Sequence, residues 1–331
     1  MCDRNSNTHH FSVELKPGQQ LPIVYHPRYN LQFFLMDKLH PVDGHKWGRI
    51  FNKLGEIGIR EEHIHLSREP SMEELLYGNT AKHLKSLKNS WKIASSTDIW
   101  MLAFVPNFYL QRKVLRPMRY QVYGTLLAGQ LALKRGWAIN IGGGFHQSSR
   151  SKMVGMSLYA DISLLVNYLF ENISYVKKIM IVNLDGHQGC GFETDFMDCD
   201  NVYIMDVYSR SIRPRDEAAK LAIKCQVELK SRTRDFEYLS KVETNFLKSL
   251  NAFTPDLVIF NAGTCILQGD IANLSISPEG IVKRDQLIFV VCRQRKLPIV
   301  MLTSGGFTRK NAGVVADSIK NLFNLKIIGI E

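Results

Sequence analysis

Four short loops that combine glycine with polar residues each follow a run of residues typical of a buried strand. The loops are GGGFHQ (142–147), NLDGHQG (183–189), NAGTC (261–265) and TSGGF (303–307), and the runs before them are WAIN, KIMIV, LVIF and PIVML. In open α/β folds, ligands bind at the carboxyl ends of parallel strands, where loops distant in sequence meet. We therefore expect all four loops to contribute to one site.

The strand-like runs alternate with segments of helical periodicity. We expect strands at 21–26, 137–140, 178–184, 202–207, 256–260 and 298–303, and helices within 31–56 and 71–88 and at 118–135, 159–171, 192–197, 214–224, 234–251, 278–294 and 309–323. Ser71, with Glu74 three residues later, predicts a helix start, and Gly136 predicts a helix end. The strands are continuous apolar runs, as in a parallel sheet with helices on both faces. The patterns predict an α/β fold with a mostly parallel central sheet.

The composition limits the class of protein. The chain has 331 residues, of which 45% are apolar, and it contains no repeat or low-complexity linker. We expect a loose tail at 1–15 and a single domain over 16–331. The N-terminus lacks the apolar core of a secretory signal, and no apolar run approaches the roughly 20 residues of a membrane span. Six cysteines without a CxxC pair indicate reduced thiols and an intracellular protein, in the nucleus, the cytoplasm or both.

The formal charge of +11 is compatible with acidic partners, including nucleic acid or chromatin. The densest basic stretches, 111–119 and 293–296, do not alternate with aromatic residues that would stack on bases. A solvated basic surface is the simpler interpretation, so direct nucleic-acid binding is not indicated.

An Asp-x-His pair follows the apolar run at 178–184. Asp185 and His187 are two residues apart, so in an extended segment both side chains point to the same side and can reach one ion. Cys265 follows another strand and is a reasonable third zinc ligand, although a lone cysteine is more often a small buried apolar residue. A purely structural role for the pair also stays open.

Two further residues lie in the same group of loops. His146 follows three glycines that lack the GxGxxG spacing, so tight turns beside a site explain them better than a nucleotide loop does. His146 is either a proton shuttle or a hydrogen-bonded core histidine. Phe307 follows Ser-Gly-Gly, and we expect its ring to face the same pocket.

With these residues in place, the chain resembles the class IV (eleven-type) histone deacetylases, which have the arginase/deacetylase three-layer α/β fold. The resemblance runs from about Leu21 to Glu331 and rests on YHPRYN, LHPVDGHKWG, PNFYLQRKVLRP, GWAINIGGGFH, DFMD, VYIMDVY, NAGT, LSISPEGIVKRD and TSGG. It implies a Zn²⁺-dependent lysine deacylase, in which a zinc-bound water attacks the carbonyl of an acyl-lysine.

The resemblance also implies a role for each site residue. The implied zinc ligands are Asp185, His187 and, in place of the family's Asp, Cys265. The implied catalytic positions are His146, Gln147 in place of a second histidine, and Phe307 in place of a tyrosine. The implied supporting residues are Asn183 and Cys190, which replace the residues beside the two histidines, and the implied tunnel residues are Gly155, Met156, Gly305 and Gly306.

These departures from the family pattern predict a degenerate site. Gln147 cannot carry a proton near neutral pH, which removes general-base catalysis worth ~10²–10⁴-fold. Phe307 has no hydroxyl, so one oxyanion donor worth roughly 2.7–4 kcal/mol is missing. His146 can substitute as a base, which leaves residual activity open.

Two hypotheses about function follow. The first is a slow deacylase of acyl-lysine proteins such as histones, with a preference for long fatty acyl chains. The second is a pseudoenzyme that binds an acyl-lysine or joins a chromatin or deacetylase complex. A binuclear arginase-like hydrolase would need more carboxylates than these loops offer.

Overall fold

An eight-stranded sheet forms the centre of the molecule. The computed structural model describes residues 18–32, 43–97 and 99–329. The strands are β1 (Ile23–Tyr25), β2 (His65–Leu66), β3 (Trp137–Asn140), β4 (Ile179–Gly186), β5 (Val202–Ser209), β6 (Cys225–Leu229), β7 (Leu257–Asn261) and β8 (Ile299–Leu302). Their order is β2-β1-β3-β8-β7-β4-β5-β6, and all pairings are parallel. Every residue of β3, β4, β7 and β8 is buried, as continuous apolar strands require.

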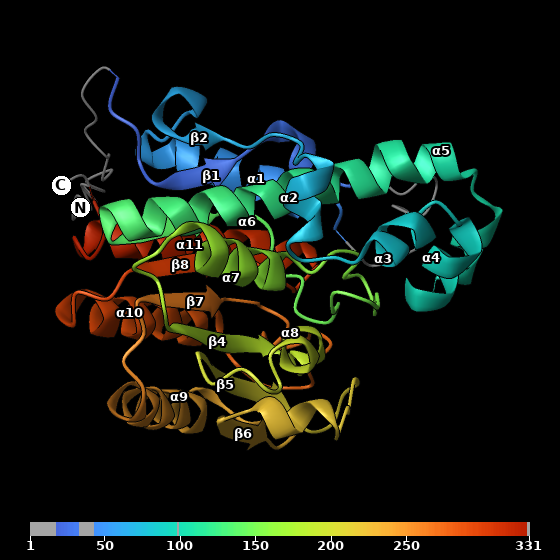
Figure 1. Ribbon diagram of the computed structural model, residues 1–331. Helices are drawn as coiled ribbons and strands as arrows, with labels where there is room; N and C mark the ends of the chain where they lie inside the picture. The colour runs from blue at the N-terminus through green and yellow to red at the C-terminus, as the bar shows by residue number, and fades with distance from the viewer. Residues whose placement is uncertain (1–17, 33–42, 98, 330–331) are drawn as a thin grey trace, which may run out of the picture.

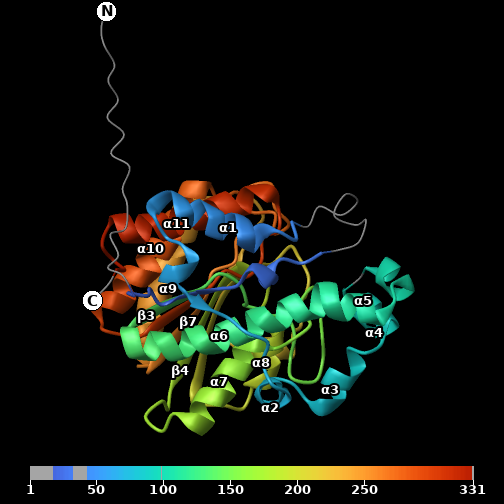
Figure 2. The same cartoon turned by 90° about the horizontal axis from the view of Figure 1, so that it is seen from above.

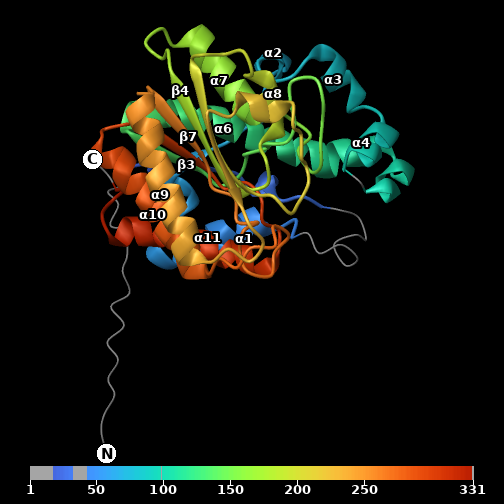
Figure 3. The same ribbon diagram turned by 90° about the horizontal axis from the view of Figure 1, so that it is seen from below.

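Helices cover both faces of this sheet (Figures 1, 2 and 3). One layer contains α6 (Arg116–Arg135) and α7 (Asp161–Asn172), and the other contains α1 (Lys46–Leu54), α9 (Asp235–Ala252), α10 (Pro278–Gln294) and α11 (Arg309–Asn324). The shorter helices are α2 (Met72–Leu76), α3 (Ala81–Ser86), α4 (Ser90–Thr97), α5 (Asn107–Leu110) and α8 (Cys190–Asp195). The predicted α/β fold with helices on both faces is confirmed. Within the described residues, no helix combines the length and apolarity needed to cross a bilayer.

The local signals for helix ends act as predicted. Ser71 Oγ accepts a hydrogen bond from Glu74 N, and the Glu74 carboxylate accepts one from Ser71 N, so the two residues form a capping box at the start of α2. Gly136 ends α6 with a φ of 76°, a left-handed conformation that favours glycine.

The region between β5 and α9 differs from the prediction. The helix expected over 214–224 is wrong: this segment contains a single 3₁₀ turn at Ala219–Ala222, and β6 follows it at the edge of the sheet. Residues of β6 alternate between exposed and buried because only one side of this edge strand packs on the core. The predicted loose tail at 1–15 lies outside the described residues.

Candidate active site

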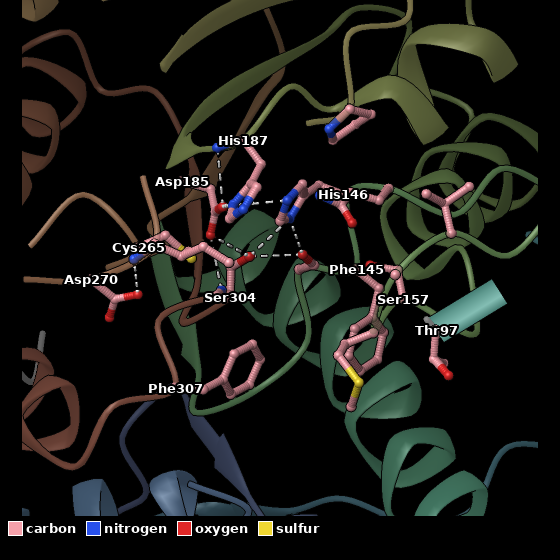
Figure 4. Close-up of a pocket in the computed structure, with 18 of the residues that line it drawn as sticks. Thr97, Phe145, His146, Ser157, Asp185, His187, Cys265, Asp270, Ser304 and Phe307 are labelled. Carbon is pink, nitrogen blue, oxygen red and sulfur yellow. Dashed lines mark hydrogen bonds and ion pairs between the residues drawn. The ribbon is translucent and has the colours of Figure 1, made fainter. Parts of the chain in front are cut away.

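The order of the strands brings the four loops together. β3, β8, β7 and β4 are neighbours in the parallel sheet, so the loops that follow them leave from the same edge. The loops line a cavity of about 810 Å³. Among its lining residues are Phe145, His146, Asp185, Cys265 and Phe307 (Figure 4). The four loops thus meet at one cavity, as expected from their positions after parallel strands.

Asp185 is the centre of the hydrogen bonds at the cavity floor. Its Oδ1 lies 2.8 Å from His187 Nδ1 and 3.4 Å from His146 Nε2. Its Oδ2 accepts a hydrogen bond of 3.0 Å from Gly305 N. Burial alone would raise the pKa of Asp185, but His146 and His187 outweigh burial and lower the pKa below its usual value. Asp185 is therefore a carboxylate at neutral pH.

His146 is buried, and its two ring nitrogens have different surroundings. Nδ1 lies 3.0 Å from the Gly144 carbonyl oxygen, which can only accept, so Nδ1 carries the proton in the neutral ring. Nε2 is buried without a hydrogen-bond partner and faces Asp185 and His187. Burial lowers the pKa of His146, although Asp185 acts in the opposite direction. A neutral imidazole with a free lone pair can serve as a metal ligand or as a base.

Three donors lie close enough together to hold one ion. Atoms of His146, Asp185 and His187 lie within 4.8 Å of one another, and among the described residues this is the group with metal-ligand chemistry. The sequence predicted Asp185 and His187 in such a group but assigned His146 to catalysis. The unpartnered Nε2 of His146 and the ionised Asp185 make the residues suitable for Zn²⁺, which accepts nitrogen and carboxylate ligands.

Cys265 lies on the other side of Asp185. A Cβ placed on Gly305 would be 2.4 Å from Asp185 Oδ2 and 2.6 Å from Cys265 Sγ, so both atoms face the bare backbone of Gly305. Burial, followed by the charges of Asp185 and Asp270, raises the pKa of the Cys265 thiol well above its usual value. The thiol is thus protonated unless a cation displaces its proton. Its Sγ is outside the group of three donors described above.

Gln147 lies in the cavity wall beside His146, and Cys190 contacts its main chain. A Cβ on Gly155, which has a φ of 57°, would lie 2.5 Å from Gln147 Oε1, so the absence of a side chain at Gly155 leaves room for this amide. Cys190 Sγ lies 3.6 Å from the backbone oxygen of Gln147. Burial raises the pKa of Cys190 to about 12, so this thiol is neutral and contacts the main chain rather than a catalytic side chain.

Asn183 supports the His187 loop instead of His146. Its Nδ2 donates to the His187 carbonyl oxygen at 2.9 Å and to Asp206 Oδ1 at 2.8 Å, and its Oδ1 accepts from Asn261 Nδ2 at 2.8 Å. The resemblance implies that residue 183 orients His146. In the structure, Gly144 O and Ser304 Oγ lie beside His146 Nδ1 instead, at 3.0 and 3.2 Å. An amide suits the position of Asn183 because it donates and accepts at once.

Phe307 faces the cavity and packs on an apolar neighbour. Its ring meets Trp47 edge to face with 6.2 Å between centroids, and the Lys46 ammonium lies 5.4 Å from its centroid. Gly155, Met156 and Gly305, which the resemblance assigns to a substrate tunnel, also line the cavity. Gly306 instead turns behind it at a φ of 86°, where a Cβ would collide with Thr264 and Asn311.

Two buried cations, which the sequence did not reveal, fix the ends of the strands. Lys46 Nζ donates to the carbonyl oxygens of Thr303, Ser304 and Gly305 at 2.6–2.8 Å. Arg284 donates to the carbonyl oxygens of Leu184, Ala262 and Gly263 at 2.6–3.3 Å. Burial lowers the pKa of Lys46 to about 8, against the effects of Cys265 and Asp185, so the ammonium persists near neutral pH. The two cations together hold the loops of β4, β7 and β8.

Sequence comparisons identify the family of the chain. The histone deacetylase domain family matches residues 40–323. "Histone deacetylase 2" of Arabidopsis thaliana is 44% identical over 308 residues, which cover 92% of this chain and 79% of the relative. "Histone deacetylase 6" of the same organism is 27% identical over 183 residues, covering 53% of this chain and 37% of the relative.

A solved structure supports the fold. The crystal structure of the HDA15 HD domain superposes with a TM-score of 0.71 at 17% sequence identity, covering 93% of this chain and 89% of that one. The arginase/deacetylase-like three-layer arrangement implied by the resemblance is thereby confirmed. Since the family match extends over most of the sequence and one relative is similar over nearly the whole chain, the chain belongs to the histone deacetylase family.

Proposed function

We propose that this chain is a divergent class IV histone deacetylase-like protein that holds Zn²⁺ and acyl-lysine but hydrolyses the acyl amide slowly or not at all. The observation that carries the proposal is the pair Gln147 and Phe307 in the cavity wall. Neither side chain can move a proton, and Phe307 cannot donate a hydrogen bond to a developing oxyanion. The proposed activity is therefore far below that of a complete deacylase site.

The zinc ligands in this proposal are Asp185, His187 and Cys265, with His146 as the competing third donor. When bound, zinc supplies Lewis-acid polarisation of a carbonyl oxygen. Cys265 can join only if its thiol loses its proton, whereas His146 already offers a free lone pair beside Asp185. Measuring bound zinc in Cys265→Ser and His146→Ala proteins distinguishes the two sets.

The position of His146 adds a second limit on activity. It is the remaining residue of the predicted catalytic set that can accept a proton. An imidazole whose Nε2 lone pair is bound to a metal cannot use that lone pair to accept a proton. If His146 completes the metal site, no side chain in the predicted set is left as a base. If Cys265 completes it, His146 is free and slow turnover remains.

The proposed ligand is an acyl-lysine of a protein such as a histone, within the nucleus, the cytoplasm or both. Met156 in the cavity wall has a flexible side chain that can repack around a long fatty acyl chain. The alternative function is that of a pseudoenzyme, which binds an acyl-lysine or joins a chromatin complex without hydrolysis. The loss of both the base and the oxyanion donor favours this alternative.

Restoring the missing groups tests the proposal. The substitutions Gln147→His, Cys265→Asp and Phe307→Tyr are made singly and together, and each protein is assayed with acetyl and long-chain acyl peptides. Catalytic groups that act as a unit are strongly non-additive, so we expect the triple variant to gain far more than the product of the single gains.

Each single substitution restores one catalytic group and leaves another missing. Gln147→His supplies a base without a donor, and the resemblance places Cys190 where the family has the carboxylate or amide associated with this histidine. Phe307→Tyr supplies a donor without a base. A folded, zinc-loaded triple variant that stays inactive on all peptides would place the defect elsewhere, with the Met153–Met156 segment as the first suspect for a blocked tunnel.

A further inference from the structure

The segment containing α4 and α5 projects from the edge of the three-layer body (Figures 1 and 2). It carries a cluster of exposed large apolar side chains, which we call the aromatic patch: Trp91 (67% exposed), Trp100 (70%), Met101 (43%), Phe104 (72%) and Phe108 (76%). The Phe104 ring lies 6.2 Å from the Trp91 ring and 6.0 Å from the Trp100 ring, centroid to centroid. These rings contact one another instead of a core, and such contiguous apolar surface marks an interaction site.

The segment that carries the aromatic patch is basic. Residues 81–113 contain the cations Lys82, Lys85, Lys88, Lys92, Arg112 and Lys113, against one acidic residue, Asp98. Five of these cations are exposed, and Lys113 is half-buried against Gln32. The net charge of this segment is therefore about half of the +11 carried by the whole chain. An occupant of this surface must offer both apolar contact and negative charge.

We propose that the aromatic patch attaches the protein to the surface of an anionic lipid bilayer. Exposed Trp and Phe beside Lys and Arg are typical of elements that lie in the membrane interface, where the rings enter the headgroup region and the cations meet anionic lipids. Aromatic rings alone also suit a protein interface, so the exposed cations of the segment decide for a lipid surface, where each adds attraction to anionic headgroups. Single-stranded nucleic acid is held in a groove, whereas these rings stand on a projection.

The aromatic patch is close to the cavity but separate from the residues of the proposed chemistry. α4 also supplies Ser96 and Thr97 to the cavity wall (Figure 4). Attachment through α4 therefore brings this wall of the cavity next to the bilayer. The attachment itself depends on neither zinc nor hydrolysis, so it goes beyond the proposed function and can be tested without it.

Vesicle binding by the full chain tests the proposal. We expect the protein to sediment with vesicles of phosphatidylcholine containing phosphatidylserine, with affinity at least about tenfold above that for phosphatidylcholine alone, and to dissociate as salt rises. Tryptophan fluorescence gives an independent measurement. Of the four tryptophans, Trp47 and Trp137 are buried, so a blue shift and quenching by brominated lipid would come from Trp91 and Trp100.

Substitutions locate the binding surface. Combining Trp91→Ser, Trp100→Ser and Phe104→Ser should weaken vesicle binding at least about tenfold, because three interfacial rings are lost. Phe236→Ser is the matched control, because Phe236 is 88% exposed but lies on α9, away from the patch (Figure 1).

Thermal melting checks that each variant is folded. If the triple variant does not fold, quenching of tryptophan fluorescence by brominated lipid in the unsubstituted protein decides whether the patch enters the bilayer. Absence of binding to both kinds of vesicle, equal binding by the folded triple variant, or self-association through the patch without vesicle binding would each overturn the proposal.

Discussion

The two sides of the cavity floor differ in how their polar groups are satisfied. On one side, Asp185 lies within hydrogen-bonding or ion-pair distance of His187, His146 and the Gly305 amide. On the other side, Phe307 offers only an apolar ring, and Cys265 keeps its proton because burial raises its pKa. Under the proposed function, the side with Asp185 and the two histidines keeps its metal donors, while the side with Phe307 and Cys265 lacks groups that move protons or stabilise charge.

The main-chain frame of the site, by contrast, is held by contacts that do not involve the side chains of Cys265 and Phe307. Lys46 and Arg284 bind main-chain carbonyl oxygens, which are present whatever side chains the loops carry. The contacts of Lys46 and Arg284 therefore do not depend on which side chains stand at 265 and 307, although Gly305 and Gly306 have no room for a Cβ. The predictions below test the frame first and then the two sides of the floor.

The largest expected effect is on the frame. Lys46→Met removes a buried ammonium that donates to three carbonyl oxygens. Gly305 O still accepts from Thr264 N and Oγ1, whereas Thr303 O and Ser304 O lose this donor. Since each buried acceptor left unsatisfied costs about 1–3 kcal/mol, we expect the free energy of unfolding to fall by roughly 3–5 kcal/mol in urea denaturation. The control is Lys53→Met on the same helix, where the change should stay within about 0.5 kcal/mol. Equal effects of the two substitutions would show that the carbonyl contacts do not hold the frame.

Zinc should stabilise the donor side of the floor. At a free zinc concentration one hundred times the dissociation constant, binding to the folded state adds about 2.7 kcal/mol to the free energy of unfolding. We expect this gain in thermal or urea unfolding of the unsubstituted protein and its loss in Asp185→Asn. Equal stabilisation of both proteins would mean that zinc binds elsewhere.

The free energy of unfolding should depend on pH through Asp195, which binds the segment leading to Gly155 and Met156. The Asp195 carboxylate accepts from Arg150 N at 3.0 Å and from Ser163 Oγ at 2.6 Å, and burial raises the pKa of Asp195 to about 6. Its folded pKa is thus above its unfolded value, so its contribution to stability is full below about pH 4 and is lost as the pH rises towards 6.

We expect this contribution to be about 2 kcal/mol, measured as the difference between the unsubstituted protein and Asp195→Asn in urea unfolding at pH 4 and pH 6.5. Because Asn does not titrate, its profile lacks this decrease. Parallel stability profiles for the two proteins would remove Asp195 as the cause.

The smallest expected effect concerns the room for Gln147. Gly155→Ala places a Cβ at a φ of 57° and 2.5 Å from Gln147 Oε1. We expect a loss of about 1–2 kcal/mol, mostly from the backbone conformation, because the flexible amide can move aside. Gly55→Ala is the control, since Gly55 has a helical φ of −58° and nothing within 4 Å of the added atom. No difference between the two variants would show that this turn is not constrained.

The sequence predicted the fold and the convergence of the loops because both depend on periodic patterns. Continuous apolar runs indicate buried parallel strands, and parallel strands place their carboxyl-end loops at one edge. β6 was missed because its alternating CQVEL pattern is short and lies at the sheet edge. The exposed short helices α4 and α5 were missed because they bury little apolar surface to create a period.

The details of the site were less predictable, because they depend on tertiary contacts. Arg284 and Asp285 lie among the buried residues of α10, and a charged pair on an apolar helix face is the signal that could have identified them. Nothing in the spacing indicated that His146 Nε2 would face Asp185, or that Cys265 would lie beyond Asp185 Oδ2. Such placements follow from the registers of four strands at once.

The central claim is that the frame and the donor side are retained while the proton-transfer chemistry is lost. The most direct test loads the unsubstituted protein with zinc, measures zinc per chain, and follows hydrolysis of acetyl-lysine and long-chain acyl-lysine peptides. The account predicts one bound zinc per chain and turnover well below ~1 s⁻¹ on every peptide, since ordinary enzymes reach about 1–10³ s⁻¹. Turnover of ~1 s⁻¹ or more on any of the peptides, or a folded protein that takes up no zinc, would contradict it.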